Sequence, residues 1–202
     1  MSIFFHYGNF KSYLKKCPIT SIFILINTVL YIASVFMKGG NVENLVKLGG
    51  LVPLFVRYFD EYYRLFTTMF LHGSLIHFLM NNFFGLLIIC AGLERLIGSF
   101  RYFFIYLLSG LISSLFIVFI QDPLSLTVTV GASGAIYGVM GCFLYIIFFK
   151  SHLLSIIDQR YIRNLLIINL IFTFIYPSVS ILGHLGGLLG GLLLSPLFLY
   201  NK

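Results

Sequence analysis

The chain has 202 residues, of which 59% are hydrophobic and only 9% are charged, and its formal net charge is +7. Ordinary globular domains carry roughly 25% charged residues, so this composition indicates a membrane protein. The basic residues are scattered between apolar runs instead of forming one patch, which is typical of charges that set membrane topology. We therefore expect a lipid bilayer, and no nucleic acid, as the partner of the positive charge.

Apolar runs divide the chain into six predicted membrane-spanning helices. One crossing needs about 20 mostly apolar residues. The last run, residues 164–201, is roughly twice that length, and we divide it at Pro177 because proline cannot continue a helix. The predicted spans cover residues 19–37, 75–93, 102–120, 134–149, 162–176 and 179–199. The sequence thus predicts an all-α, six-transmembrane-helix bundle that forms one domain over residues 1–202, with a short cytoplasmic tail at 1–18.

The basic residues fall unequally on the two sides of these spans. The side of the termini has more of them than the other side, where they all lie in the first loop, residues 38–74. By the positive-inside rule both termini are cytoplasmic, and the protein is a multi-pass protein of the cell membrane. Residues 45–63 of the first loop mix apolar and charged side chains, which predicts an interfacial segment. The basic residues on the side of the termini are Lys11, Lys15, Lys16, Arg95, Arg101, Lys150, Arg160, Arg163 and Lys202. Those in the first loop are Lys38, Lys47, Arg57 and Arg64.

The fourth predicted span, residues 134–149, is short. It gives about 24 Å of helix, whereas the hydrocarbon core is about 30 Å thick. If Lys150 marks the cytoplasmic surface, this helix starts roughly 6 Å below the outer surface, and residues 124–130 descend as irregular backbone. Such backbone is tolerated at that depth only if it is buried in protein or lines a wet cavity. The sequence therefore predicts a short, recessed fourth helix below a water-accessible pocket.

Two reactive side chains are predicted near the bottom of that pocket. Ser133 lies at the start of the fourth span, where backbone N–H groups have no helical partner. His184 lies in the last span, about 8 Å from its outer end and so at nearly the same depth. A serine between small residues often serves helix packing, and a buried histidine is often simply hydrogen-bonded. However, ionisable residues inside a span are costly and indicate function.

The second predicted span and the residues just before it carry three polar side chains. His77 and Asn81 are four residues apart and share one helical face, and His72 precedes them. The pair at 77 and 81 is equally consistent with interhelical hydrogen bonding.

Glycines predict how the fourth and sixth spans pack. Gly134 and Gly138, like Gly187 and Gly191, have the four-residue spacing that lets helix backbones approach closely. We expect Gly187 to point at the fourth span and Leu192 to face lipid.

These residues together resemble the three signature motifs of the rhomboid family of intramembrane serine proteases, in the family's order and on its second, fourth and sixth spans. Tyr63-Arg64 resembles the family's Trp-Arg pair, with tyrosine in place of tryptophan, and Glu94-Arg95 also fits. The resemblance covers essentially the whole chain in the basic six-span form. The strings that carry it are His77-Phe78-Leu79-Met80-Asn81, Gly131-Ala132-Ser133-Gly134-Ala135-Ile136-Tyr137-Gly138, and His184-Leu185-Gly186-Gly187 followed by Gly191.

The resemblance implies a Ser-His dyad that cuts transmembrane segments of membrane proteins near the outer face. His184 would act as general base for the nucleophile Ser133, through an acyl-enzyme. It implies that Tyr137 packs against the histidine ring and that the oxyanion is held by the Ser133 N–H with His77 and Asn81, with His72 as a further candidate. No cofactor and no metal are implied. The supporting residues are Gly131, Gly134, Gly138, Gly187, Gly191, Arg64 and Tyr137.

Other readings can be compared with the same sequence. No histidine is followed by glutamate, as the metalloprotease motif requires, and no carboxylate lies within a span, as aspartyl chemistry requires. The alternatives left open are a catalytically silent rhomboid-like protein that binds transmembrane helices and a small transporter or channel, since broken helices also build transport sites. The silent relatives lack the serine or the histidine, and this chain has both.

Overall fold

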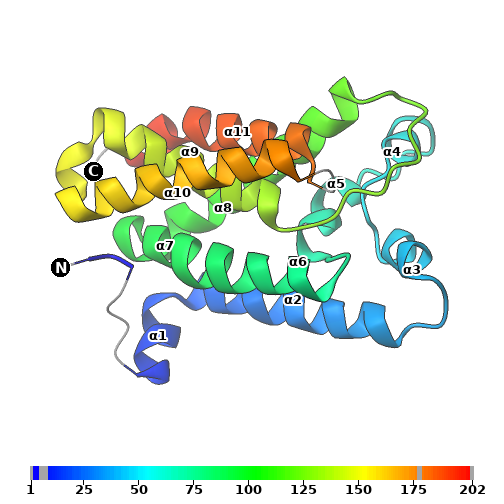
Figure 1. Ribbon diagram of the computed structural model, residues 1–202, viewed down its shortest axis with the longest axis horizontal. Coiled ribbons are helices and arrows are strands. Elements are labelled where there is room, and N and C mark those ends of the chain that lie inside the picture. Colours follow the sequence, from blue (N-terminus) through cyan, green and yellow to red (C-terminus); the bar gives the residue numbers. More distant parts are fainter. Residues whose placement is uncertain (1, 5–8, 177–178, 201–202) are drawn as a thin grey trace.

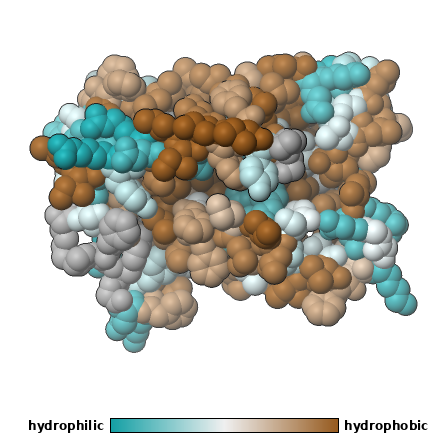
Figure 2. Space-filling view, viewed as in Figure 1, coloured by the Kyte–Doolittle hydropathy of each residue, from teal (hydrophilic) through white to brown (hydrophobic). Residues whose placement is uncertain are grey.

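A computed structural model describes residues 2–4, 9–176 and 179–200, and this part of the chain is helical, without β-strands. The helices run side by side in an elongated bundle, with both ends of the chain at one end of it (Figure 1). Three short helices, α3 (Asn41–Lys47), α4 (Pro53–Tyr58) and α5 (Arg64–Thr67), lie at the opposite end. Hydrophobic residues cover the middle of the bundle and hydrophilic ones gather toward its two ends (Figure 2). The predicted all-α membrane bundle is therefore confirmed.

Six long helical stretches of the described chain correspond to the predicted spans. Four of them are long and apolar enough to cross a membrane, namely Pro18–Phe36, Leu75–Ile97, Ser99–Ile120 and Ile181–Leu199. The fourth stretch is shorter, at 17 residues, as predicted. The stretches are α2 (Pro18–Phe36), α6 (Leu75–Leu79) continued by the π-helix η2 (Met80–Cys90) and α7 (Ala91–Ile97), α8 (Ser99–Ile120), α9 (Ser133–Phe149), α10 (Ile156–Ile175) and α11 (Ile181–Leu199). The remaining helices are α1 (Phe10–Lys16), η1 (Thr68–Phe70) and η3 (Ser151–Leu153).

Helix α10 begins at Ile156, six residues before the predicted start at 162. The Ser155 hydroxyl caps it by accepting from the Asp158 N–H at 3.1 Å, and the buried Asp158 carboxylate accepts from the Ser2 hydroxyl at 2.7 Å. Because the helix starts this early, it includes the charged residues Asp158 and Arg160 as well as Arg163, and α10 is not among the four apolar spans. The proposed dividing residue, Pro177, lies outside the described residues.

The second long stretch also runs past its predicted end at 93, because Glu94 is buried inside the bundle with 1% of its surface exposed. Its carboxylate accepts from the backbone N–H groups of Ile19 and Thr20, both at 2.9 Å. These are N–H groups of the first turn of α2, which have no helical partner. A charged residue thus joins two helices instead of marking the end of one.

The segment predicted as a tail contributes to the core. Phe4 is 1% exposed, and its ring packs 4.8 Å from that of Tyr161 and 5.8 Å from that of Phe143. Gly92 makes room for it, because a Cβ there would lie 2.7 Å from the Phe4 ring. The N-terminal segment therefore joins α7, α9 and α10 at one end of the bundle.

Helices α9 and α11 touch through their backbones. A Cβ at Gly187 would overlap the carbonyl oxygen of Gly134, and a Cβ at Gly191 would overlap that of Gly138. One turn further along, Gly141 lies against the Leu188 carbonyl in the same way. This agrees with the glycine spacing in the sequence and places the two helix backbones in direct contact.

Leu192, expected to face lipid, is only partly exposed. Leu192 is half-buried, and its backbone nitrogen would lie 2.9 Å from a Cβ at Gly141, so it belongs to the contact between α9 and α11. The neighbouring Leu193 is 71% exposed and is the residue that points outward.

Gly187→Val should lower the melting temperature by several degrees, whereas Leu193→Val should leave it nearly unchanged. Overfilling a tight contact typically costs about 1 to 3 kcal/mol, and backbone atoms of Gly134 cannot move aside as a flexible side chain could. Thermal unfolding of both variants in the same detergent measures the difference. Equal melting temperatures for Gly187→Val and the wild type would contradict the proposed tightness of this contact.

Candidate functional site

The irregular segment predicted at residues 124–130 leads into α9 and is held by the first loop. Leu51 and Thr129 exchange two backbone hydrogen bonds, of 3.0 and 2.9 Å. The Thr68 hydroxyl donates to the Thr129 carbonyl at 2.6 Å, and the Thr68 carbonyl accepts from the Gly131 N–H at 3.0 Å. The backbone groups just before Ser133 therefore have protein partners, as irregular backbone at membrane depth requires.

Arg64 organises that loop. Its side chain is buried, and Nη1 donates to the carbonyls of Val46 and Gly50, both at 2.8 Å. Nε forms an ion pair with Glu61, and the guanidinium lies 5.1 Å from the centre of the Phe55 ring. The partners of the Arg64 guanidinium thus lie within the first loop. Arg64 contributes to the site by holding the loop that contacts residues 129–131.

Gly131 brings the loop, a histidine and Ser133 together. Its φ of +132° lies in the region that favours glycine. A Cβ there would lie 2.7 Å from Nε2 of His77 and 3.6 Å from the Ser133 hydroxyl oxygen. Only glycine leaves room for the His77 ring against this backbone. The His77 ring and the Ser133 hydroxyl both lie next to the position that a Cβ of residue 131 would occupy.

Ser133 is the first residue of α9, and His184 is the fourth residue of α11. The imidazole of His184 stacks on the ring of Tyr137, with centroids 3.9 Å apart and planes 18° apart. Tyr137 follows Ser133 by one helical turn and therefore shares its helix face. The histidine ring therefore stacks on a residue one helical turn after Ser133. It is 6% exposed.

The other side of the histidine ring meets a group that the sequence did not suggest. Nδ1 of His184 lies 2.8 Å from the hydroxyl oxygen of Thr173 on α10. That oxygen lies 2.5 Å from the Tyr137 hydroxyl, and both hydroxyls hydrogen-bond to the Asn169 carbonyl, at 2.8 and 2.7 Å. A threonine in an apolar run usually bonds to the carbonyl four residues before it, so its sequence position alone gives no functional signal.

The remaining predicted residues lie around the start of the second long stretch. Asn81 is buried and donates one amide N–H to the His77 carbonyl at 3.0 Å, which leaves its second N–H for another acceptor. The π-helix begins at Met80, between these two residues, and such wide turns often occur at functional sites.

His72 is buried directly behind His77, with ring centroids 5.2 Å apart. Within the described chain its two ring nitrogens have no hydrogen-bond partner. Burial and then the neighbouring His77 lower the pKa of His72 to about 3. His72 is therefore neutral near pH 7.

Among the described residues no group of three or more His, Cys, Asp or Glu side chains could hold a metal ion. The three cysteines are buried and unpaired with one another, and we assign them no role.

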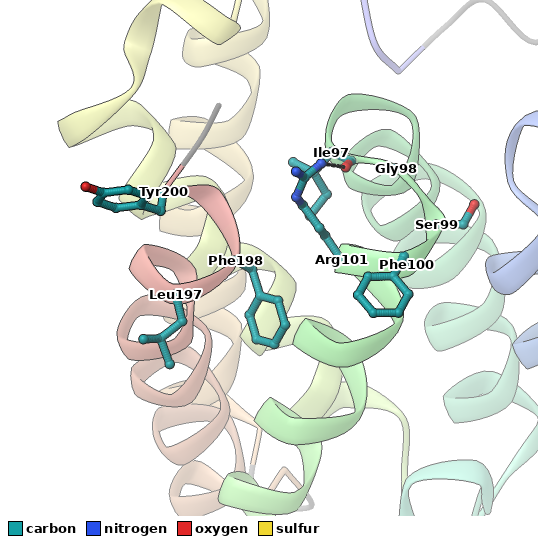
Figure 3. A pocket seen from close by; sticks show the side chains of 8 residues that line it. All are labelled: Ile97, Gly98, Ser99, Phe100, Arg101, Leu197, Phe198 and Tyr200. Atoms are coloured by element: carbon teal, nitrogen blue, oxygen red, sulfur yellow. Dashed lines mark hydrogen bonds between the residues drawn. The ribbon is translucent and has the colours of Figure 1, made fainter.

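A hollow of about 510 Å³ lies away from these residues, between the start of α8 and the end of α11 (Figure 3). Arg101 projects beside it and donates to the Ile97 carbonyl at 3.3 Å. Leu197 in its wall is about 20 Å along α11 from His184. The hollow therefore belongs to the end of the bundle that holds the chain termini, and not to the Ser133 region.

Comparisons with known proteins agree with the motifs. A family model described as "Rhomboid domain" matches residues 60–201. The chain is 29% identical over 208 residues to "Putative rhomboid protease YdcA" of Bacillus subtilis (strain 168). The aligned region covers 99% of this chain and 98% of that protein. It is 31% identical to "Rhomboid protease GluP" of the same organism over 87% of this chain but only 34% of GluP. It is also 30% identical to human "Inactive rhomboid protein 1" over 69% of this chain and 16% of that protein.

Proposed function

Because this chain belongs to the rhomboid family, we propose that it is an intramembrane serine endopeptidase in which Ser133 is the nucleophile and His184 the general base. Membership alone supports intramembrane proteolysis in general, and one relative carries the name of an inactive protein. The proposal therefore rests on this chain's own residues. The observation that carries it is the stacking of His184 on Tyr137, one turn from Ser133, at 3.9 Å.

The reaction follows from which histidine nitrogen is free. Nδ1 of His184 is engaged by Thr173, so Nε2 is the nitrogen for the serine. Nε2 removes the Ser133 proton while the oxygen attacks a peptide carbonyl. The new Nε2–H then passes to the departing amine, which leaves an acyl-enzyme. Water, deprotonated by the same nitrogen, hydrolyses that ester and restores the serine.

The negative charge that develops on the carbonyl oxygen needs donors. The Ser133 N–H belongs to the first turn of α9 and has no partner required by the helix. His77 and the Ser133 hydroxyl both lie next to Gly131, and one side-chain N–H of Asn81 is not used in its bond to the His77 carbonyl. We assign these three groups to the oxyanion, with His72 as a further candidate behind His77.

The substrates we propose are transmembrane segments of membrane proteins, cut near the outer face. The protein is a multi-pass membrane protein, and we place it in the cell membrane with both termini cytoplasmic. Two observations support this orientation, namely the position of both chain ends at one end of the bundle and the excess of basic residues there. No cofactor enters the mechanism.

A second candidate function is binding of transmembrane helices without cleavage, which the 30% identity to human "Inactive rhomboid protein 1" brings into consideration. The presence of both Ser133 and His184 favours the protease. Activity measurements on variants of these two residues separate the two functions.

Ser133→Ala and His184→Ala should each abolish cleavage of a model transmembrane segment in liposomes, and the double variant should be no worse. Residues that act as one unit are strongly non-additive. Ser195→Ala is the matched control, because this buried hydroxyl of α11 donates to the Gly191 carbonyl and lies about 16 Å along the helix from His184. A serine-directed fluorophosphonate should label the wild type and Ser195→Ala alone. Turnover by Ser133→Ala at the wild-type rate would overturn the protease assignment.

Asn81→Ala and His77→Ala should lower turnover about 10²- to 10³-fold, the usual cost of losing one oxyanion donor, without removing labelling of Ser133. Asn82→Ala is the control, because the side-chain amide oxygen of Asn82 accepts from the Asn27 side chain of α2 at 3.3 Å and serves packing. It should lower the melting temperature more than the turnover. Unchanged turnover in folded Asn81→Ala and His77→Ala would make this pair structural.

Single cysteines placed at Lys11 and Lys202, in a background without the native cysteines, should resist an impermeant thiol reagent in intact cells and react after lysis. The expected protection follows from the basic residues on the side of the termini. A cysteine at Lys47 in the first loop should react in intact cells. Labelling of either end before lysis would reverse the orientation.

A further inference from the structure

The histidine of the proposed dyad has a hydroxyl where serine hydrolases commonly have a carboxylate. Thr173, 1% exposed, lies 2.8 Å from Nδ1 of His184. Each of the six Asp and Glu side chains of the chain has a partner other than His184. Glu94 bonds to α2, Asp158 to Ser2 and Ser155, Glu43 to Lys47, Asp60 to Tyr62, Glu61 to Arg64, and Asp122 to the Leu124 N–H.

The i to i−4 geometry of Thr173 favours one placement of the protons in this network. The Thr173 hydroxyl has one proton, and the Asn169 carbonyl, 2.8 Å away, accepts it in the usual i to i−4 geometry. The Asn169 carbonyl has a second lone pair, and the Tyr137 hydroxyl lies 2.7 Å from this oxygen and 2.5 Å from that of Thr173. With its own proton placed on Asn169, the Thr173 oxygen can only accept from Nδ1. The histidine then carries its proton on Nδ1, and Nε2 is free.

We propose that Thr173 is a positioning residue for His184, a role that rests on the proposed function of His184 as general base. Its oxygen accepts the Nδ1–H and selects the tautomer whose Nε2 can take the Ser133 proton. When Nε2 holds that proton the ring is positive, and the same hydrogen bond becomes charge-assisted and stronger. Thr173 keeps its own proton throughout, so no proton moves beyond the histidine.

Tyr137 completes the arrangement from the other helix. Its ring stacks on the imidazole and its hydroxyl contacts Thr173 and Asn169, so one side chain of α9 fixes both the ring plane and the hydroxyl that faces Nδ1. The three residues come from α9, α10 and α11, and together they link the outer half of α10 to the dyad.

Thr28 shows what a merely structural threonine looks like in this protein. It lies in α2 and donates to the Ile24 carbonyl at 2.7 Å, the same backbone contact that Thr173 makes with Asn169. What distinguishes Thr173 is the additional contact with the histidine nitrogen. Thr28→Val is therefore a matched control for Thr173→Val, since both remove one hydroxyl and one i to i−4 bond.

Thr173→Val should lower kcat about 10- to 100-fold with little change in KM, which corresponds to the loss of one hydrogen bond to a charged group. Thr173→Ser, which restores the hydroxyl, should return kcat to within a few-fold of the wild type, and Thr28→Val should match the wild type. The rate of fluorophosphonate labelling of Ser133 should fall in parallel in Thr173→Val, because it reports the serine's reactivity without substrate binding. Full kcat and full labelling in folded Thr173→Val would overturn the proposal.

The tautomer is measured independently of activity. Nitrogen NMR of ¹⁵N-histidine-labelled protein, with the His184 signal assigned by its loss in His184→Gln, should show the Nδ1–H form in the wild type and in inactive Ser133→Ala. Thr173→Val should shift the signal toward the Nε2–H form. An Nε2–H form in the wild type would overturn the role of Thr173 even if Thr173→Val fails to fold. Because the NMR result does not need turnover, it separates this failure from a failure of the protease assignment.

Discussion

The backbone contact between α9 and α11 is the constraint on which the site depends. Serine and histidine have short side chains, so helices at an ordinary distance could not bring both to one substrate atom. At two levels the backbones meet without a side chain between them, because Gly187 lies against the Gly134 carbonyl and Gly191 against the Gly138 carbonyl. Helix α8 strengthens the arrangement, because the Ser113 hydroxyl donates to the Gly183 carbonyl at 2.7 Å, one residue before the histidine. In a bilayer, where apolar surface gains little from association, such close packing is the main force that joins helices.

The two sides of the site are built differently. On one side the first loop is a rigid support, because Arg64 holds its carbonyls and Thr68 fixes the backbone at Thr129 and Gly131. On the other side α10 is anchored at its first turn through Asp158, while its later residues such as Ile171 and Ile175 are exposed to the surroundings. In this later half, the Thr173 hydroxyl and the Asn169 carbonyl connect α10 to His184 and Tyr137. A polar network therefore supports the histidine on the side where apolar packing is sparse.

The sequence was most informative where function and packing depend on spacing along one helix. The positions of the long helices, the short α9 and the contact of Gly187 with α9 all follow from periodicity and from the small residues themselves. The early start of α10 and the burial of Glu94 could not be predicted, because charges at a span's end look topogenic until their partners, Ser2 and the first turn of α2, are known. Thr173 was missed for the same reason, since its partner His184 lies on another helix. Leu192 is less exposed than its neighbour Leu193, and its backbone lies at the close contact with Gly141.

The cost of burying charge explains why a hydroxyl suits the position beside the histidine. An ionised carboxylate inside a membrane-spanning bundle loses its water and is expensive unless several donors replace it. Glu94 is buried at an acceptable cost because the first turn of α2 supplies such donors. The Thr173 hydroxyl, in contrast, contacts a histidine, a tyrosine and the Asn169 carbonyl. A neutral oxygen still accepts the Nδ1–H, and its attraction to the ring rises only when the ring becomes positive. In the proposed mechanism the enzyme therefore stabilises the charge at the moment it forms, without keeping an ion in the membrane for the rest of the cycle.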